Sequence, residues 1–211
     1  GDLFLRAQEW ASARGWQPFM TEALSSEGTA GKGGVGIFVR SHIEATIPSG
    51  ANSHVLVPEY CVFVHIHAGP RHGFLAGSLY LEQGHKLSGP NTSKISTIGA
   101  YLAYYKIPYI LGGDWNLTPN ELSESGLCER LRGRLVVPKQ GTYRDPKTGN
   151  HSMLDYWMAS DSVAACMGVP EPFAEFPPRN HYAIRGTLTG GVRAKSMKVL
   201  AGPHAFPVNP V

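Results

Sequence analysis

The sequence is poor in cysteine and has no long hydrophobic run. Among 211 residues there are only 3 cysteines, and Cys61, Cys128 and Cys166 stand far apart without forming a Cys-x-x-Cys pair. This excludes a disulfide framework and a cysteine zinc site, and it favours a reducing compartment. No apolar run reaches the roughly 18 residues that a membrane-spanning helix needs. We therefore expect an intracellular protein, in the nucleus or cytoplasm, that is not secreted and does not enter a membrane.

The chain also has little net charge, because its basic and acidic residues nearly balance. The net charge is +3, and three of the 19 basic residues, but none of the 16 acidic ones, lie in the segment 190–211. The rest of the chain is therefore neutral and attracts no phosphate backbone through its overall field, so nucleic-acid binding would need a local basic cluster or a metal ion. The length fits one domain, which we place at 1–189. The Gly- and Pro-rich segment 190–211 is expected to be a mobile or loosely docked tail or linker.

The spacing of apolar residues predicts helices and strands that alternate irregularly. Helices are expected at 1–14, 93–105 and 120–130. Short apolar runs predict strands at 19–23, 35–39, 60–67, 74–81, 108–111, 141–144, 152–160 and 182–188. The Gly-rich stretch 28–34 is expected to be a flexible turn. Because several strands are apolar on both faces, a layered α/β sandwich is favoured over a barrel of regular βα units.

The most informative segment is the run Gly-Gly-Asp-Trp-Asn at 112–116. An apolar strand ends there and delivers Asp114 and Asn116, two residues apart, so both side chains project to the same side. Carboxylate and carboxamide oxygens together suit Mg²⁺ or a phosphate-bound water. The alternative without a functional role is an Asx turn that closes the strand.

Two later segments add to this chemistry. Asp155 stands inside an apolar strand, where a charge is costly unless it has a partner. His181 begins the last strand, and an aspartate bound to one of its ring nitrogens would fix the tautomer so that the other nitrogen faces a substrate. We expect Asp155 and His181 to lie within hydrogen-bonding reach, with Asp114 and Asn116 on the same cleft. Taken alone, His181 is more typical of a surface histidine.

These segments carry a resemblance to a known family. The runs at 112–116, Leu-Asp-Tyr-Trp at 154–157 and Asn-His at 180–181, in that order, resemble the endonuclease/exonuclease/phosphatase superfamily of metal-dependent phosphodiesterases. The run at 33–40 looks like the second major strand of that family, and 79–81 looks like the strand with its active-site Tyr. The nearest likeness is to the endonuclease-like domains found beside reverse transcriptases in retroelements. The resemblance implies a four-layer α/β sandwich of two packed mixed β-sheets flanked by helices, lacking its first strands.

The resemblance also implies a role for each site residue. Asp114 would orient or deprotonate the attacking water, and Asn116 would hold the scissile phosphate. Tyr80 would contact or stabilise that phosphate. His181, oriented by Asp155, would stabilise the negative charge that develops on the phosphorane-like transition state.

The implied cofactor is Mg²⁺ or Mn²⁺, held by Asp114, Asn116 and Asn180. Two departures from the family pattern weaken this site. The family opens with a strand bearing an Asn and a strand ending in Gln-Glu, whose Glu binds the metal, and both are expected upstream of this chain. The Gln-Glu pair at 8–9 is the available substitute, but it lies within the helical pattern of residues 1–14. Asn180 stands where the family usually has Asp, which retains an oxygen ligand but removes a charge. The resemblance therefore implies an enzyme whose activity is impaired.

The implied function is metal-dependent phosphodiester hydrolysis. Within this class, an endonuclease that acts on DNA is favoured. Two alternatives stay open: a non-catalytic remnant that binds nucleic acid or a partner, and a phosphatase of a small phosphodiester or inositol-phosphate substrate. A contiguous basic groove would favour nucleic acid. Such a groove, or a solvated loop face, could be formed by Arg130, Arg132, Arg134, Lys139, Arg144 and Lys147. The implied partners are DNA and a downstream reverse-transcriptase-like region of a longer polypeptide.

A second metal-binding pattern stands apart from these motifs. His65 and His67 alternate along a predicted strand, so they share one face at a spacing that could bind a metal. No third ligand is evident in the sequence. Residue statistics favour a half-exposed strand face beside Arg71 and His72.

Overall fold

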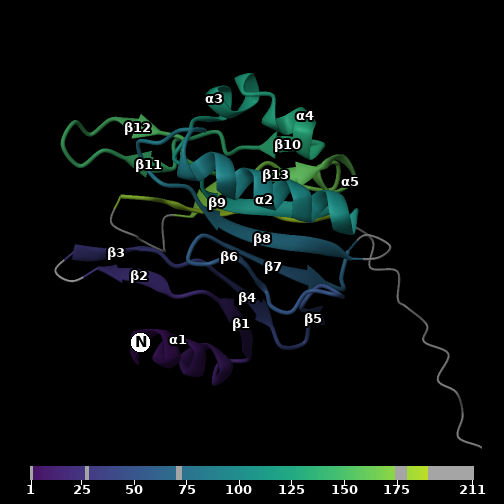
Figure 1. The fold of residues 1–211 in the computed structure, drawn as a ribbon. Coiled ribbons are helices and arrows are strands. Elements are labelled where there is room, and N and C mark those ends of the chain that lie inside the picture. The colour runs from purple at the N-terminus through teal and green to yellow at the C-terminus, as the bar shows by residue number, and fades with distance from the viewer. Residues whose placement is uncertain (1, 27–28, 70–72, 174–179, 190–211) are drawn as a thin grey trace, which may run out of the picture.

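The computed structural model describes residues 2–26, 29–69, 73–173 and 180–189. These residues form four layers: the helices α2 to α4, a large mixed sheet, the strand pair β1–β4, and helix α1 (Figure 1). The predicted α/β sandwich is thus confirmed. The tail expected at 190–211 lies outside the described residues. Within the described part of the chain, no helix has both the length and the apolar character needed to cross a bilayer.

The large sheet positions the polar residues of interest. Its strand order is β10-β13-β9-β8-β7-β5, with β6 also paired to β7, and only β8 and β9 run parallel. The bounds are β5 Ala45–Thr46, β6 Val55–Val57, β7 Cys61–Ile66, β8 Phe74–Tyr80, β9 Tyr109–Asp114, β10 Gly133–Val136 and β13 Asp155–Ser160. Because β8 and β9 are parallel, their last residues, Tyr80 and Asp114, are direct partners at one edge of the sheet.

Helices cover one face of this sheet (Figure 1). They are α2 Pro90–Tyr105, α3 Pro119–Glu124 and α4 Leu127–Leu131, with the short α5 Asp161–Ala164 following β13. The main core lies beneath them, where Ile98 of α2 packs among Phe63, Leu111 and Tyr156 of the strands, all buried. The single helix expected at 120–130 is interrupted at Gly126, which adopts a left-handed conformation with φ 69°.

The opposite face is covered by strands. β1 Trp16–Met20 pairs antiparallel with β4 Gly36–Arg40, and α1 Asp2–Ser12 lies outside this pair (Figure 1). A second core between the layers contains Val39, Val64 and Ile66. The second sheet layer, expected to be mixed, is therefore an antiparallel pair within the described residues.

The Gly-rich stretch at 28–34 corrects the sequence analysis. Instead of a turn, most of it forms β3 Thr29–Gly33, which pairs antiparallel with β2 Ala23–Ser26. Glycines lower strand propensity but do not prevent backbone pairing. At Gly33 the absence of a side chain is required, because φ is +76° and a Cβ would lie only 2.6 Å from the Glu59 carbonyl oxygen.

Two further hairpin-like pairs complete the fold. β11 Tyr143–Arg144 pairs with β12 His151–Ser152, and β14 Glu171–Phe173 pairs with β15 Ala183–Arg185. The strand expected at 152–160 is thus divided between β12 and β13. His181 precedes β15 and forms an isolated antiparallel bridge with Tyr143, so the β11–β12 hairpin lies directly beside this histidine.

Candidate active site

Two aspartates face each other across neighbouring strands. Asp114 ends β9 and Asp155 begins β13, and the antiparallel register makes them direct partners. Side chains of directly opposed residues project from the same face of a sheet, and like charges placed there repel. The fold therefore concentrates negative charge at one edge of the sheet.

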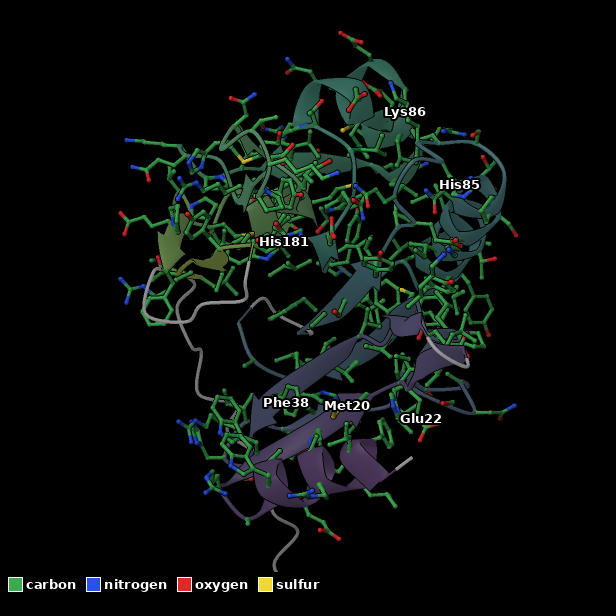
Figure 2. All side chains as sticks on the ribbon, turned by 90° about the vertical axis from the view of Figure 1, so that its left-hand side faces the viewer. Met20, Glu22, Phe38, His85, Lys86 and His181 are labelled. Atoms are coloured by element: carbon green, nitrogen blue, oxygen red, sulfur yellow. The ribbon has the colours of Figure 1, made fainter. Side chains whose placement is uncertain are left out.

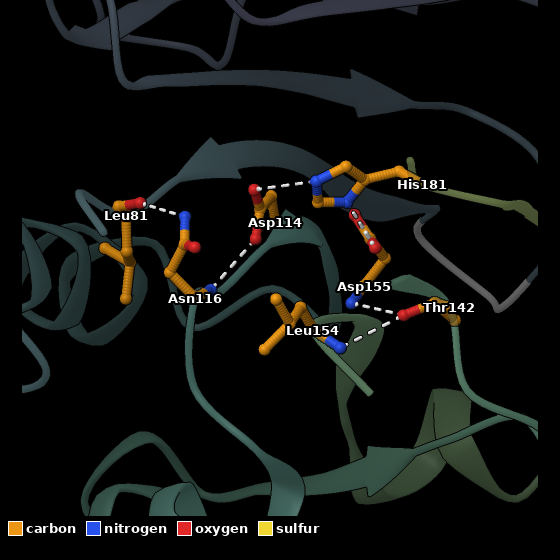
Figure 3. Close-up of polar contacts among 7 residues, drawn as sticks. All are labelled: Leu81, Asp114, Asn116, Thr142, Leu154, Asp155 and His181. Carbon is orange, nitrogen blue, oxygen red and sulfur yellow. Dashed lines mark hydrogen bonds and ion pairs between the residues drawn. The ribbon is translucent and has the colours of Figure 1, made fainter. Parts of the chain in front are cut away.

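His181 lies between these carboxylates (Figure 3). Its Nδ1 is 2.8 Å from Oδ2 of Asp155, and its Nε2 is 4.0 Å from Oδ2 of Asp114. The expected contact between Asp155 and His181 is thus confirmed. With Nδ1–H donated to Asp155, Nε2 is the nitrogen that faces Asp114. Figure 2 shows His181 on the face that also presents Phe38 and His85.

Thr142 joins the segments that carry Asp155 and His181, and sequence reasoning missed it. Its Oγ1 accepts the backbone N–H groups of Leu154 at 3.0 Å and Asp155 at 2.8 Å (Figure 3). Its backbone carbonyl accepts the N–H of Tyr182, the residue after His181, at 2.6 Å. Thr142 is fully buried. One residue therefore holds both site segments, Asp155 through its hydroxyl and the His181 segment through its backbone carbonyl, and no local pattern signals these contacts.

Asn116 is held by two hydrogen bonds, one from its backbone and one from its side chain. Its backbone N–H donates to Asp114 Oδ1 at 3.0 Å, which closes an Asx turn, and its φ is +47°. Its side-chain Nδ2 donates to the Leu81 carbonyl at 2.7 Å. The turn thus holds Asp114 and Asn116 side by side, next to the end of β8 (Figure 3).

Tyr80 stands at the end of a column of side chains that sequence reasoning also missed. Its ring stacks on Tyr60, with centroids 6.2 Å apart, and Lys94 Nζ lies 3.3 Å from the centroid of the Tyr60 ring. Lys94, which is buried on α2, also forms an ion pair with Glu82 at 2.5 Å. The column fixes Tyr80 from the side away from Asp114, and Tyr60, Lys94 and Glu82 belong to no sequence motif.

Asn180 and the Gln-Glu pair at 8–9 do not join the cluster through their side chains in the described contacts. The backbone carbonyl of Asn180 accepts the N–H of Arg144 at 2.8 Å, which anchors the residue next to His181. Gln8 and Glu9 lie within α1, as the helical pattern predicted, and Glu9 is exposed. Figure 1 shows α1 on the far side of the β1–β4 pair.

Solved structures of other proteins share this fold. No protein-family model and no curated protein matches the sequence. The structure is similar to the endonuclease domain of TRAS1, a telomere-specific non-LTR retrotransposon (TM-score 0.61, 13% identity, 81% of this chain and 80% of that one). It is also similar to the 3'-5' exonuclease NExo from Neisseria meningitidis (0.59, 14%, 85% and 82%) and to an AP endonuclease from Archaeoglobus fulgidus (0.58, 13%, 86% and 82%). The chain has the endonuclease/exonuclease/phosphatase fold.

Within this endonuclease/exonuclease/phosphatase fold, the site groups have shifted pKa values. Burial raises the pKa of Asp114 to about 6, and the charge of Asp155 adds to the rise, against the N–H of Asn116 and the charge of His181. The hydrogen bond that His181 donates to Asp155 raises the pKa of His181. Burial raises the pKa of Tyr80, with Asp114 adding to the rise. Near neutral pH the site thus combines a carboxylate, an imidazole that holds its proton more tightly, and a neutral phenol.

The donor set fits a divalent cation. Asp114, Asp155 and His181 each offer a ligand atom, and these atoms lie within 4.8 Å of one another. The carboxylate of Asp114 and the amide oxygen of Asn116 are hard oxygen donors of the kind that Mg²⁺ and Mn²⁺ prefer. Asp155 already accepts from His181. A cation would also relieve the repulsion between the two carboxylates.

Proposed function

We propose that this protein hydrolyses phosphodiester bonds with the help of a divalent cation, and that its substrate is DNA. The single observation that carries the proposal is the placement of His181, whose Nδ1 binds Asp155 while its Nε2 faces Asp114. The fold supports it, since TRAS1 and NExo with the same fold are an endonuclease and an exonuclease, and a NExo variant has been solved with a product DNA hairpin.

His181 stabilises the negative charge of the transition state. The hydrogen bond that it donates to Asp155 raises its pKa, so a larger fraction of the imidazole is protonated near neutral pH. The Nε2–H group then donates to a non-bridging phosphate oxygen, where charge accumulates as water attacks phosphorus. Asp155 fixes the ring orientation before substrate arrives, so no reorganisation is required during the reaction.

Asp114 activates the attacking water. Because burial brings its pKa to about 6, it is deprotonated at neutral pH and still basic enough to accept a proton. As the proton moves from water to the carboxylate, the water oxygen bonds to phosphorus, the bond to the leaving oxygen breaks, and the leaving oxygen takes a proton from solvent. The N–H of Asn116, 3.0 Å from Asp114 Oδ1, holds the carboxylate in position for this transfer.

Asn116 and Tyr80 hold the scissile phosphate. The amide of Asn116 is fixed by its donation to Leu81. Tyr80 is directly opposite Asp114 in the sheet, and its raised pKa keeps the phenol neutral and able to donate to a phosphate oxygen. Stacking on Tyr60 limits the orientations of the Tyr80 ring.

Mg²⁺ or Mn²⁺ would be held by Asp114 and Asn116, and Asn180 is kept as the third ligand that the resemblance implies, although its described contact is made by its backbone. When bound, the cation supplies charge neutralisation at the phosphate and lowers the pKa of a bound water. Asn180 contributes at most a neutral oxygen, so binding is expected to be weaker than in a site with a third carboxylate. We therefore expect slow hydrolysis rather than efficient turnover.

DNA is favoured over a small phosphodiester by the β11–β12 hairpin. This hairpin borders His181 and presents Arg144 and Lys147, both exposed, to solvent. The N–H of Arg144 donates to the Asn180 carbonyl, so the hairpin is anchored to the residue before His181. Such cations suit phosphates that flank a scissile bond in a polymer. DNA as substrate implies action in the nucleus or cytoplasm, and the likeness to TRAS1 supports a reverse-transcriptase-like region as partner.

Nicking of supercoiled plasmid tests the proposal. With Mg²⁺ or Mn²⁺, we expect slow nicking that EDTA abolishes, that His181→Ala lowers by at least about 100-fold, and that His42→Ala leaves unchanged. His42 is an exposed histidine that follows β4, so it controls for loss of a histidine outside the site. Nicking that survives in His181→Ala would refute the assigned mechanism.

The two alternatives give different results in the same preparation. A non-catalytic remnant would retain DNA binding, measured by fluorescence anisotropy, and would show no His181-dependent nicking with either cation. A phosphatase of small substrates would cleave bis(4-nitrophenyl) phosphate in a His181-dependent way and would leave plasmid intact. Substitution of Arg144 and Lys147 by Glu would then not affect the rate, whereas it would weaken DNA cleavage and its dependence on salt.

A further inference from the structure

A second cluster of metal-ligating side chains lies where β5 pairs with β7. Thr46 is the direct partner of His65, and the N–H of His67 donates to the Glu44 carbonyl at 2.9 Å, which extends the same register by two residues. Residues opposed in this way share a face of the sheet. The intervening pair, Ala45 and Ile66, belongs to the core on the other face. Glu44, Thr46, His65 and His67 therefore project from one face.

The two imidazoles are in direct contact. Their ring centroids are 4.2 Å apart, with 36° between the planes, and His67 Nε2 lies 2.8 Å from Thr46 Oγ1. Thr46, His67 and Glu44 are exposed. The buried Gly73 makes room for the pair, because a Cβ there would lie 3.0 Å from His65 Nε2.

This cluster is separate from the candidate active site. His65 is opposite Leu75 at the start of β8, whereas Asp114 is opposite Tyr80 at its end. At about 3.3 Å per residue, five residues separate the two positions by about 17 Å. Leu75 packs in the main core and Ala76 in the second core, so odd and even positions of β8 point to opposite faces. The histidines thus lie on the face opposite Asp114.

We propose that His65, His67 and Glu44 form a binding site for a divalent transition metal of the Zn²⁺ class. Two imidazoles and a carboxylate favour Zn²⁺ or Cu²⁺ over Mg²⁺, which prefers oxygen ligands. In the tautomer that carries the proton on Nε2, His67 donates to the Thr46 hydroxyl, which leaves Nδ1 as the ligand and provides the outer hydrogen bond typical of ligating histidines. Glu44, whose backbone is opposite His67 and whose side chain is exposed, is the carboxylate that would complete the set after a change of rotamer.

Such a site would stabilise the pairing of the edge strand β5 with β7. β5 has only two residues, Ala45 and Thr46, and pairs with β7 alone in the described sheet. A cation bound to Glu44 on one strand and to both histidines on the other links these strands directly. Because the unfolded chain does not hold these ligands together, the bound cation stabilises the folded state.

The first test is binding of Zn²⁺ alone, by calorimetry and thermal unfolding of the intact chain with a phosphine reductant. At about 100 times its Kd, Zn²⁺ is expected to raise Tm by about 5–10 °C. His67→Ala and His65→Ala should each weaken binding at least about tenfold, and Glu44→Gln by less. His85→Ala controls for an exposed histidine elsewhere, and Asp114→Asn separates this site from the candidate active site. An absence of Zn²⁺ binding, or binding lost in Asp114→Asn and kept in His67→Ala, would overturn the proposal.

A second measurement needs no variant to fold. In the imidazole ¹⁵N NMR spectrum, Zn²⁺ should shift the resonances of two histidines together, with a stoichiometry of one cation, while an excess of Mg²⁺ leaves them in place. Shifts confined to the resonance of His181 would overturn the proposal.

Discussion

Thr142 and Asp155 are 13 residues apart in the chain, yet the hydroxyl oxygen of Thr142 accepts the backbone N–H of Asp155 at 2.8 Å. The same oxygen accepts the N–H of Leu154, and the Thr142 carbonyl accepts from Tyr182. The start of β13 and the segment with His181 are therefore fixed to one buried residue. Loss of these hydrogen bonds would leave Asp155 and His181 free to move relative to one another.

Removal of the Thr142 hydroxyl should cost both stability and activity. Thr142→Val retains the shape but leaves two backbone N–H groups without their acceptor, so the free energy of unfolding should fall by about 1–3 kcal/mol. Thr142→Ser, which keeps the oxygen, should lose only about 1 kcal/mol for the methyl group. Urea unfolding and the nicking rate measure both effects. Equal losses in the two variants would show that packing, and not the hydroxyl, matters at this position.

The contacts of Thr142 show why part of the site could be predicted and part could not. The local sequence pattern identifies Asp114, Asp155 and His181, because each is a charged or polar residue that interrupts or ends an apolar run. Lys94 and Tyr60 carry no such signal, since their roles depend on how α2 and the sheet pack. The hairpin strand β3 was missed because glycine suppresses the side-chain pattern on which strand prediction relies.

The dependence of activity on pH should be bell-shaped. Asp114 must lose its proton to act as a base. Its pKa is about 6 without a cation and falls when a cation binds, so the rate should rise with pH at or below about 6. His181 must keep its proton, and since its pKa is raised above the ordinary 6.5, the rate should fall only at higher pH. Initial nicking rates at constant ionic strength test this, and the two limbs report on the coupled groups together. A profile that rises without falling would contradict the role of the imidazolium.

Asp114 should also make stability depend on pH. Its pKa is about 6 in the folded protein against 3.8 ordinarily, so the folded state binds this proton more tightly. The resulting stabilisation is complete below about pH 3.8 and is lost as pH rises through about 6. Asp114→Asn should therefore be more stable than the parent at about pH 8, by about 1–3 kcal/mol, and similar to it near pH 4.

The control for this substitution is Glu124→Gln, which removes the same charge from an exposed position on α3. Urea unfolding at the two pH values measures both variants. A gain for Asp114→Asn that is the same at both pH values would rule out the buried carboxylate as its source. A gain in stability with a loss of nicking would show that the charge of Asp114 lowers stability but is required for activity.

Gly112 and Gly186 both face the ring of Trp157, and a Cβ at either position would clash with it. Trp157 is the direct partner of Gly112 and lies two residues after Asp155 on β13. Gly112→Ala must therefore displace the indole, which should cost about 1–3 kcal/mol and lower the nicking rate by moving Asp155. Gly99→Ala is the control, because its Cβ would meet only the flexible end of Leu131 and alanine favours the helix.

In the double variant Gly112→Ala/Trp157→Phe the smaller ring leaves space for the methyl group, so its unfolding free energy should exceed the value expected from adding the two single losses. Additive losses would mean that Gly112 is required for backbone reasons and that Trp157 does not position Asp155.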